Sequence, residues 1–207
     1  MPGPSLSRYD APGRTEAMVL VLHGGKARSS APVTGRSLTW RRAQGLARAL
    51  GEPLHAQGVG LWVLRYRTVG WNADGTGKVD DTRWALDRIR AEIGEVPVAL
   101  LGHSMGGRAA CRAADHELVR GVVALAPWLP PHEPVTALAG RQLHAAHGRR
   151  DHITRAQDTR AYVERARKVA SAASFTDMGE RGHYLLRGAH AWNSVAVDGV
   201  RQVLAAG

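Results

Sequence analysis

The chain has 207 residues, of which 44% are hydrophobic and 22% are charged, a composition typical of a soluble globular protein. It contains no apolar run long enough to span a membrane, and its first residues lack the apolar core of a signal peptide. We therefore expect a single cytoplasmic domain over residues 1–207, with residues 1–14 loosely ordered and without a membrane partner. Cys111 is the only cysteine, which excludes an internal disulfide, and its alanine-rich surroundings favour a packed, unreactive thiol.

The formal net charge of +10 raises the question of nucleic-acid binding. Basic residues are scattered along the chain, with no run of five or more and no interleaving with aromatic residues. We therefore expect no nucleic-acid partner, whereas an attraction for acidic substrates remains open. The expected oligomeric state is a monomer or a small homo-oligomer.

Short apolar runs alternate with helix-like segments. Such runs predict strands that are buried on both faces, and the alternation predicts an α/β protein whose mostly parallel sheet of about six strands is flanked by helices on both faces. The connection 23–37 is expected to be loose. The expected strands are 17–23, 60–66, 96–102, 121–127, 141–148 and, as the weakest, 171–179, and the expected helices are 39–50, 80–93, 105–117, 155–170 and 192–205.

The sequence Gly102-His103-Ser104-Met105-Gly106 directly follows one of these strands and opens a helix. This is the setting of a nucleophile elbow, in which a serine stands on a sharp turn between strand and helix. The two glycines leave room for the strand and the helix to pack closely. The hydroxyl of Ser104 then lies at the helix N-terminus, which favours a developing oxyanion.

A serine needs a base and an orienting acid to act as a nucleophile. Asp151 directly follows the strand 141–148 and is the candidate acid, although it can also be read as a helix-capping residue. Asp177 follows a strand too, but one strand later. His183, in the loop after the last strand, is the candidate base, and His190 is the alternative.

The first apolar strand ends in His23-Gly24-Gly25. The backbone N–H groups of Gly25 and Met105 are candidate donors of an oxyanion hole. In the alternative interpretation, the two glycines only turn the chain.

The segments HGG (23–25), GHSMGG (102–107), HGRRD (147–151) and GHYLLR (182–187) resemble those of the α/β-hydrolase superfamily, over about residues 15–205. The chain is similar to small bacterial hydrolases of the dienelactone-hydrolase-like and acyl-esterase type. This resemblance implies an α/β-hydrolase fold and a serine hydrolase that acts through Ser104, Asp151 and His183. It also implies that Gly25 and Met105 form the oxyanion hole, and that neither a metal nor a cofactor is needed.

The chain departs from the family pattern in three ways. The family usually has more strands, so the early antiparallel strands are expected to be absent or reduced to something near SRYDAPG (7–13). Only residues 128–140 fit the place of a lid, which predicts one small helix at most and an open site. Dienelactone hydrolases proper use a cysteine nucleophile, so their substrate does not carry over to Ser104.

The implied activity is cleavage of a small ester, thioester or lactone through an acyl-enzyme. Acyl transfer or another non-hydrolytic activity on the same triad is the alternative, and a catalytically idle binding module is a weaker one. Trp71 and Trp128 fit an aromatic pocket wall and core packing equally well. The full set of substrate-pocket candidates is His23, Gly24, Lys26, Trp71, His103, Trp128, His152 and Tyr184.

Overall fold

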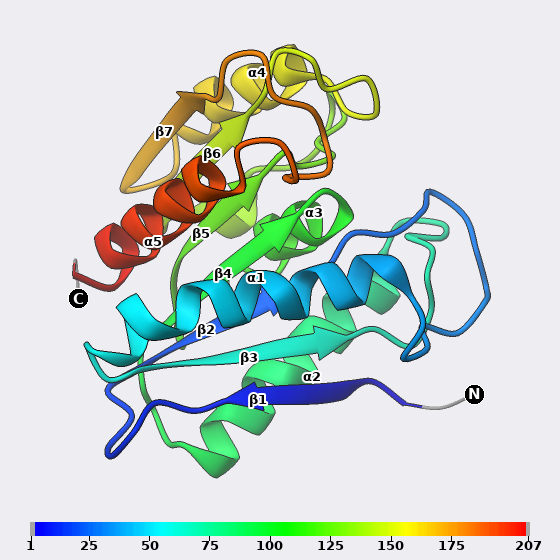
Figure 1. Ribbon diagram of the computed structural model, residues 1–207. Coiled ribbons are helices and arrows are strands. Elements are labelled where there is room, and N and C mark those ends of the chain that lie inside the picture. Colours follow the sequence, from blue (N-terminus) through cyan, green and yellow to red (C-terminus); the bar gives the residue numbers. More distant parts are fainter. Residues whose placement is uncertain (1–2, 206–207) are drawn as a thin grey trace.

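The computed structural model describes residues 3–205. Within this range a seven-stranded sheet has the order β1-β3-β2-β4-β5-β6-β7. Strands β2 to β7 are parallel to one another, and β1 pairs antiparallel with β3 at one edge (Figure 1). The strands are β1 (Ser5–Tyr9), β2 (Ala17–Leu22), β3 (Val59–Arg65), β4 (Val98–His103), β5 (Val119–Leu125), β6 (Gln142–His147) and β7 (Ala172–Asp177). The helices are α1 (Leu38–His55), α2 (Thr76–Glu92), α3 (Met105–Arg112), α4 (Ala156–Ala166) and α5 (Ala189–Ala205), with a short 3₁₀ helix η1 (Thr136–Leu138).

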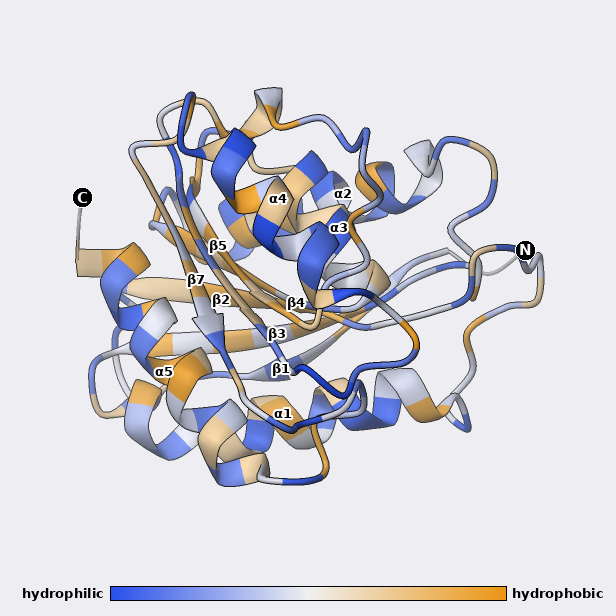
Figure 2. Ribbon diagram, turned by 90° about the horizontal axis from the view of Figure 1, so that it is seen from above, coloured by the Kyte–Doolittle hydropathy of each residue, from blue (hydrophilic) through white to orange (hydrophobic). Residues whose placement is uncertain are grey.

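The helices form two layers, one on each face of the sheet. Figure 2 shows α1 and α5 on one face and α2, α3 and α4 on the other. Each layer covers its own apolar core, one packed around Trp62 and Tyr162 and the other around Leu50 and Trp192. The predicted parallel sheet with helices on both faces is therefore confirmed, and the apolar runs are strands because both of their faces are covered.

The prediction that residues 1–14 are loosely ordered is wrong for Ser5–Tyr9, which form β1. The reduced antiparallel strand expected near residues 7–13 overlaps β1, which begins earlier, at Ser5. Its signal is weak because an edge strand is only partly buried and needs no apolar run. The segment is held by backbone pairing with β3 and by the Trp62 indole, which donates a hydrogen bond of 2.8 Å to Asp10 and stacks under the Arg8 guanidinium.

The connection 23–37 was expected to be loose, but it pairs with the segment after β3. Lys26 forms a bridge with Gly70, and Pro32 forms one with Thr68. Gly70 allows this close approach, because a Cβ atom there would lie 2.2 Å from the Ser29 nitrogen. The glycine is thus the sequence feature that permits this pairing.

The connection between β5 and β6 holds only η1, in agreement with the expected single small helix. Its Glu133 is buried and forms ion pairs with Arg108 and Arg112 of α3. Breaking such a buried pair costs about 3–5 kcal/mol, so this connection is fixed to the fold. In the described range no helix is long and apolar enough to cross a membrane.

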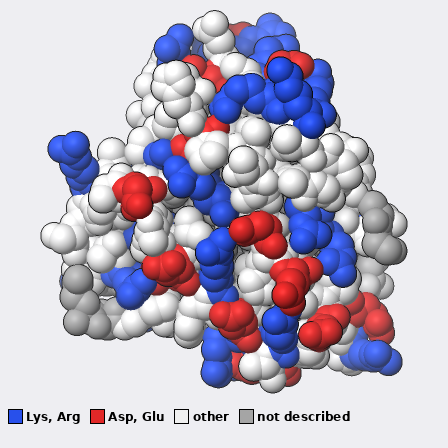
Figure 3. Space-filling model, turned by 180° about the vertical axis from the view of Figure 1, so that it is seen from behind, with Lys and Arg blue, Asp and Glu red and all other residues white. Residues whose placement is uncertain are grey.

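Charges of both signs are interspersed on the face of the molecule opposite to α1 and α5 (Figure 3). The ion pairs Arg83–Asp115 and Arg90–Glu117 join α2 to the segment that follows α3. Much of the positive charge on this side is therefore balanced locally.

Candidate active site

Ser104 lies on the sharp turn between β4 and α3. Its backbone has φ 56° and ψ −120°, a conformation that is costly for a residue with a side chain. The turn is possible because a glycine stands two residues before Ser104 and another two residues after it. A Cβ atom on Gly102 would lie 2.4 Å from the Gly106 oxygen, and one on Gly106 would lie 2.1 Å from the Leu22 oxygen.

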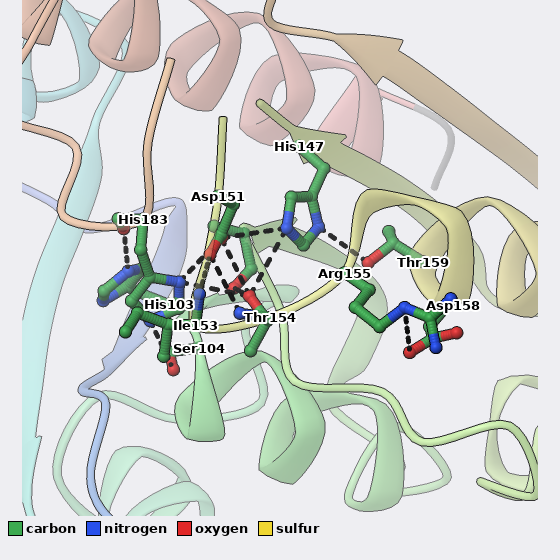
Figure 4. Close-up of polar contacts among 11 residues, drawn as sticks. His103, Ser104, His147, Asp151, Ile153, Thr154, Arg155, Asp158, Thr159 and His183 are labelled. Atoms are coloured by element: carbon green, nitrogen blue, oxygen red, sulfur yellow. Dashed lines mark hydrogen bonds and ion pairs between the residues drawn. The ribbon is translucent and has the colours of Figure 1, made fainter. Parts of the chain in front are cut away.

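Ser104, His183 and Asp151 form a continuous hydrogen-bonded chain (Figure 4). The Ser104 Oγ atom is 2.9 Å from Nε2 of His183, and Nδ1 of the same ring is 2.7 Å from Oδ2 of Asp151. The carboxylate can only accept, so Nδ1 carries the proton and Nε2 is free to accept the serine proton. The structure thus brings the three predicted catalytic residues together from loops far apart in the sequence.

Asp151 is surrounded by donors. Its Oδ1 atom accepts hydrogen bonds of 2.8 Å from the backbone N–H groups of Ile153 and Thr154, and its Oδ2 atom accepts one of 2.8 Å from the Thr154 hydroxyl. Burial by itself raises the pKa of this carboxyl, but the hydrogen bonds from His147, His183 and the two backbone groups outweigh it and hold the pKa well below its usual range. The group is therefore an anion that can orient and stabilise an imidazolium.

The role of His147 next to this carboxylate was missed at the sequence level. His147 is fully buried, and its Nε2 atom donates to Oδ2 of Asp151 over 2.9 Å, while Nδ1 lies 2.8 Å from the Thr159 hydroxyl. A histidine four residues before the acid, in HGRRD, was the available signal. The burial of the His147 side chain could not be predicted from this motif, because the strand that contains His147 is only partly apolar in sequence.

The glycine pair after β2 lies beside the elbow. A Cβ atom on Gly24 would be 3.3 Å from Cβ of Ser104, and one on Gly25 would be 2.6 Å from the Met105 sulfur. The Gly25 amide has no hydrogen-bond acceptor in the described range, and Met105 is the first residue of α3, where N–H groups lack helical partners. The two amides are therefore available to an oxyanion at Ser104.

Two further histidines pack around the site as neutral, buried groups. His103 donates from Nε2 to the His183 carbonyl oxygen over 2.8 Å, and the two rings are 4.9 Å apart. Burial, reinforced by the electrostatic effect of the neighbouring His183 ring, lowers the pKa of His103 to about 3. His23 donates from Nδ1 to the Gly24 carbonyl oxygen and accepts from the Tyr66 amide, and burial lowers its pKa to about 4.

Trp71 and Trp128 form an aromatic pair with centroids 6.2 Å apart, and the Arg108 guanidinium stacks on both rings. Trp71 is 4% exposed, so it serves mainly as packing. Trp128 is half-buried, and its amide donates to the Ser104 carbonyl oxygen over 3.1 Å.

The remaining candidates lie at the surface. Tyr184 is 52% exposed and packs edge-on against the His183 ring at 5.5 Å. Lys26 and His152 are exposed, and their pocket roles stay predictions. The alternative base, His190, is exposed at the start of α5 and forms no hydrogen bond with Ser104 or Asp151.

Asp177 and Cys111 lie outside the hydrogen-bonded chain of Ser104, His183 and Asp151. The alternative acid, Asp177, pairs with Arg149 and Arg160 rather than with a histidine. Cys111 is buried, and burial raises the pKa of its thiol to about 12, as expected of an unreactive group.

The fold and this site define the class of protein. A family model described as alpha/beta hydrolase fold matches residues 18–175, more than half of the chain. The chain belongs to the alpha/beta hydrolase fold family, and its fold is that of a hydrolase-type enzyme. No curated protein sequence matches it closely enough to count as a relative.

Solved structures of similar fold cover nearly the whole chain. An alpha-beta serine hydrolase homologue from Coxiella burnetii is 17% identical, with a TM-score of 0.75 over 97% of this chain and 95% of that one. XC6422 from Xanthomonas campestris, a serine hydrolase described as lacking a lid, is 20% identical, with a TM-score of 0.71 over 99% and 97% of the two chains. Est1E from Butyrivibrio proteoclasticus is 11% identical, with a TM-score of 0.70 over 98% and 94%.

Proposed function

We propose that this protein is a serine hydrolase that cleaves small esters, thioesters or lactones. The observation that carries the proposal is the hydrogen-bonded chain from Ser104 through His183 to Asp151, at the start of α3 and beside the free Gly25 amide. A serine hydroxyl with a base at 2.9 Å and a buried anion behind that base is the arrangement that nucleophilic acyl transfer needs.

The reaction proceeds in two steps. As Ser104 Oγ bonds to the substrate carbonyl carbon, its proton passes to His183 Nε2, and the Gly25 and Met105 amides hold the oxyanion, each worth about 3 kcal/mol in comparable sites. The tetrahedral intermediate collapses, the leaving group takes the proton from His183, and the acyl group stays on Ser104. Water then attacks the acyl-enzyme carbonyl carbon as it loses a proton to His183 Nε2. The bond from that carbon to Ser104 Oγ breaks, His183 returns the proton to the serine oxygen, and the acid is released.

The connection between β5 and β6 leaves water able to act as the second nucleophile. The only helix between β5 and β6 in the described range is η1, so no helical lid excludes solvent. A site without a lid suits small substrates better than long-chain lipids, and it gives the acyl-enzyme no protection from hydrolysis. Est1E, whose fold is similar, is known with ferulic acid bound, which is consistent with a small aromatic or aliphatic ester here.

Labelling with a fluorophosphonate, followed by mapping of the adduct by mass spectrometry, tests the nucleophile. We expect the adduct on Ser104 alone, together with turnover of 4-nitrophenyl acetate and other short-chain 4-nitrophenyl esters. Ser104→Ala should lower kcat at least about a thousandfold, whereas Ser194→Ala, at an exposed position of α5, should not. Folded protein without an adduct on Ser104 would sink the proposal, and release of free acid in water distinguishes hydrolysis from acyl transfer.

A further inference from the structure

A largely apolar groove lies beside the candidate triad, on the face of the sheet that α1 covers. It has a volume of about 520 Å³ and lies between α1, the end of β2, and the loop 184–188 with the start of α5. In Figure 1 this loop runs above α1. Leu38, Tyr184 and Leu186 line the groove, although they are 71%, 52% and 69% exposed. Apolar side chains gathered at the rim of a hollow favour an apolar ligand.

The charged side chains that line the groove are all basic. Arg41, Arg42 and Arg48 of α1 line it, and no aspartate or glutamate does. Within the described range no carboxylate lies within 4.0 Å of any of the three guanidinium groups. The surface arginines of α2 behave differently, because Arg83, Arg88 and Arg90 each pair with a carboxylate. The groove therefore offers cationic groups that a ligand anion can satisfy.

The inner end of the groove consists of immediate neighbours of the triad. His103, which precedes Ser104, lines it and holds the His183 carbonyl oxygen. Tyr184 lines it too, with its ring against the His183 imidazole and the Arg42 guanidinium 5.0 Å over its centroid. Ser104 and Asp151 do not line it, so the groove accommodates a part of a ligand away from the reacting carbonyl.

We propose that the groove binds the remote part of the substrate, and that this part is an apolar chain that carries an anionic group such as a carboxylate. The inference rests on the proposed hydrolase function and specifies its substrate class. The chain lies along Leu38, Tyr184 and Leu186, and the anion pairs with arginines of α1. Binding energy from such a remote part can be used to raise kcat/KM at the reacting bond.

Direct binding tests the groove without turnover. Ser104→Ala protein is titrated with octanoate and with the neutral octanamide in a calorimeter. We expect octanoate to bind more tightly, and a further Arg42→Gln change to weaken octanoate about tenfold, because it removes one charge-assisted contact. The matched control is Arg88→Gln on the opposite layer, which removes the same charge and should leave octanoate binding unchanged.

A steric pair of variants tests the location. Gly45 of α1 lines the groove, and a Cβ atom there meets nothing within 4 Å. Both Gly45→Ala and Gly45→Phe remove a glycine from an exposed position inside a helix, which favours the helical backbone. We expect Gly45→Phe to block octanoate and Gly45→Ala to leave it bound.

Kinetics with the active enzyme test the link to catalysis. The 4-nitrophenyl monoesters of dicarboxylic acids from glutarate to sebacate are compared with alkanoate esters of the same chain length. A higher kcat/KM for the carboxylate-bearing ester at one or more lengths, lost in Arg42→Gln and kept in Arg88→Gln, supports the proposal. Absence of that preference at every length overturns it.

The remaining outcomes separate the two proposals. If 4-nitrophenyl acetate is cleaved but octanoate binds no better than octanamide, the groove inference is wrong and the hydrolase function stands. If octanoate binds as expected but no ester is cleaved through Ser104, the proposed function is wrong and the substrate role of the groove falls with it. Adsorption to phosphatidylglycerol vesicles without octanoate binding would mark a membrane-facing surface and overturn the inference.

Discussion

His147 and His183 both form a hydrogen bond with the same oxygen of Asp151. Nε2 of His147 lies 2.9 Å from Oδ2, and Nδ1 of His183 lies 2.7 Å from it. One ring faces Ser104, and the other is anchored to the Thr159 hydroxyl inside the protein. The buried histidine thus holds the carboxylate that orients the candidate base.

Replacing His147 by leucine removes one donor from Asp151. Because the hydrogen bond stabilises the charged form of the acid, its loss raises the pKa of Asp151, and we expect kcat to fall about tenfold with little change in KM. His147→Gln, whose amide can donate to the same oxygen, should retain more activity. The split between kcat and KM checks this, because a less well oriented base lowers kcat and leaves substrate binding unchanged. If both variants lose kcat to the same extent and both raise KM, the role of His147 is purely structural.

His183→Ala and His190→Ala together test the identity of the base. His183 lies 2.9 Å from Ser104 Oγ, whereas His190 is exposed and has no contact with the hydroxyl. We expect His183→Ala to lower kcat by about a thousandfold or more and to slow fluorophosphonate labelling, with His190→Ala close to the unmodified protein. Loss of activity in His190→Ala alone would show that the base has been wrongly assigned.

Protein stability should fall as the pH is lowered below about 6.5. His23 and His103 have pKa values of about 4 and about 3 in the folded protein, so they stay neutral there while the unfolded chain takes up a proton below 6.5. The unfolded state then binds more protons, and each histidine removes about 1.4 kcal/mol of stability per pH unit until its folded pKa is reached.

Urea unfolding at several pH values between 7 and 5 measures this slope. His103→Asn removes one titrating group, so the slope of stability against pH should become shallower by about 1.4 kcal/mol per pH unit. The same change should lower the stability at pH 7, because it removes the hydrogen bond to the His183 carbonyl oxygen. A slope that is the same in both proteins would mean that His103 is not a buried neutral group.

Two glycine-to-alanine changes in helices should have opposite effects. Gly106→Ala places a Cβ atom 2.1 Å from the Leu22 oxygen, so either α3 or the end of β2 must move, and we expect a loss of stability of about 1–3 kcal/mol with a loss of activity. Gly77→Ala in α2 meets nothing within 4 Å and should stabilise the protein by up to about 1 kcal/mol. Urea unfolding compares them, and a neutral Gly106→Ala would show that the elbow is not closely packed.

The parts of the site that could be predicted from the sequence are those encoded in short local motifs. The elbow is recognisable from sequence because its chemistry is contiguous: an apolar strand, Ser104 flanked by Gly102 and Gly106, and a helix. The parallel sheet is readable for a similar reason, since strands covered on both faces must be continuous apolar runs. For β1 the sequence indicated at most a reduced strand near residues 7–13, because the residues of β1 are half-buried and its partner β3 lies far along the chain.

The sequence by itself determined the fold class and the residue types of the proposed chemistry, because hydrophobic periodicity and turn glycines act locally. Only the tertiary structure decided which candidates meet. It placed His183 rather than His190 on Ser104, added His147 and Thr154 to Asp151, and buried Trp71 as packing. It also gathered apolar side chains around one groove, together with arginines that have no carboxylate partner among residues 3–205. Such contacts join positions far apart in the chain, and they depend on how strands and helices pack, which no local pattern records.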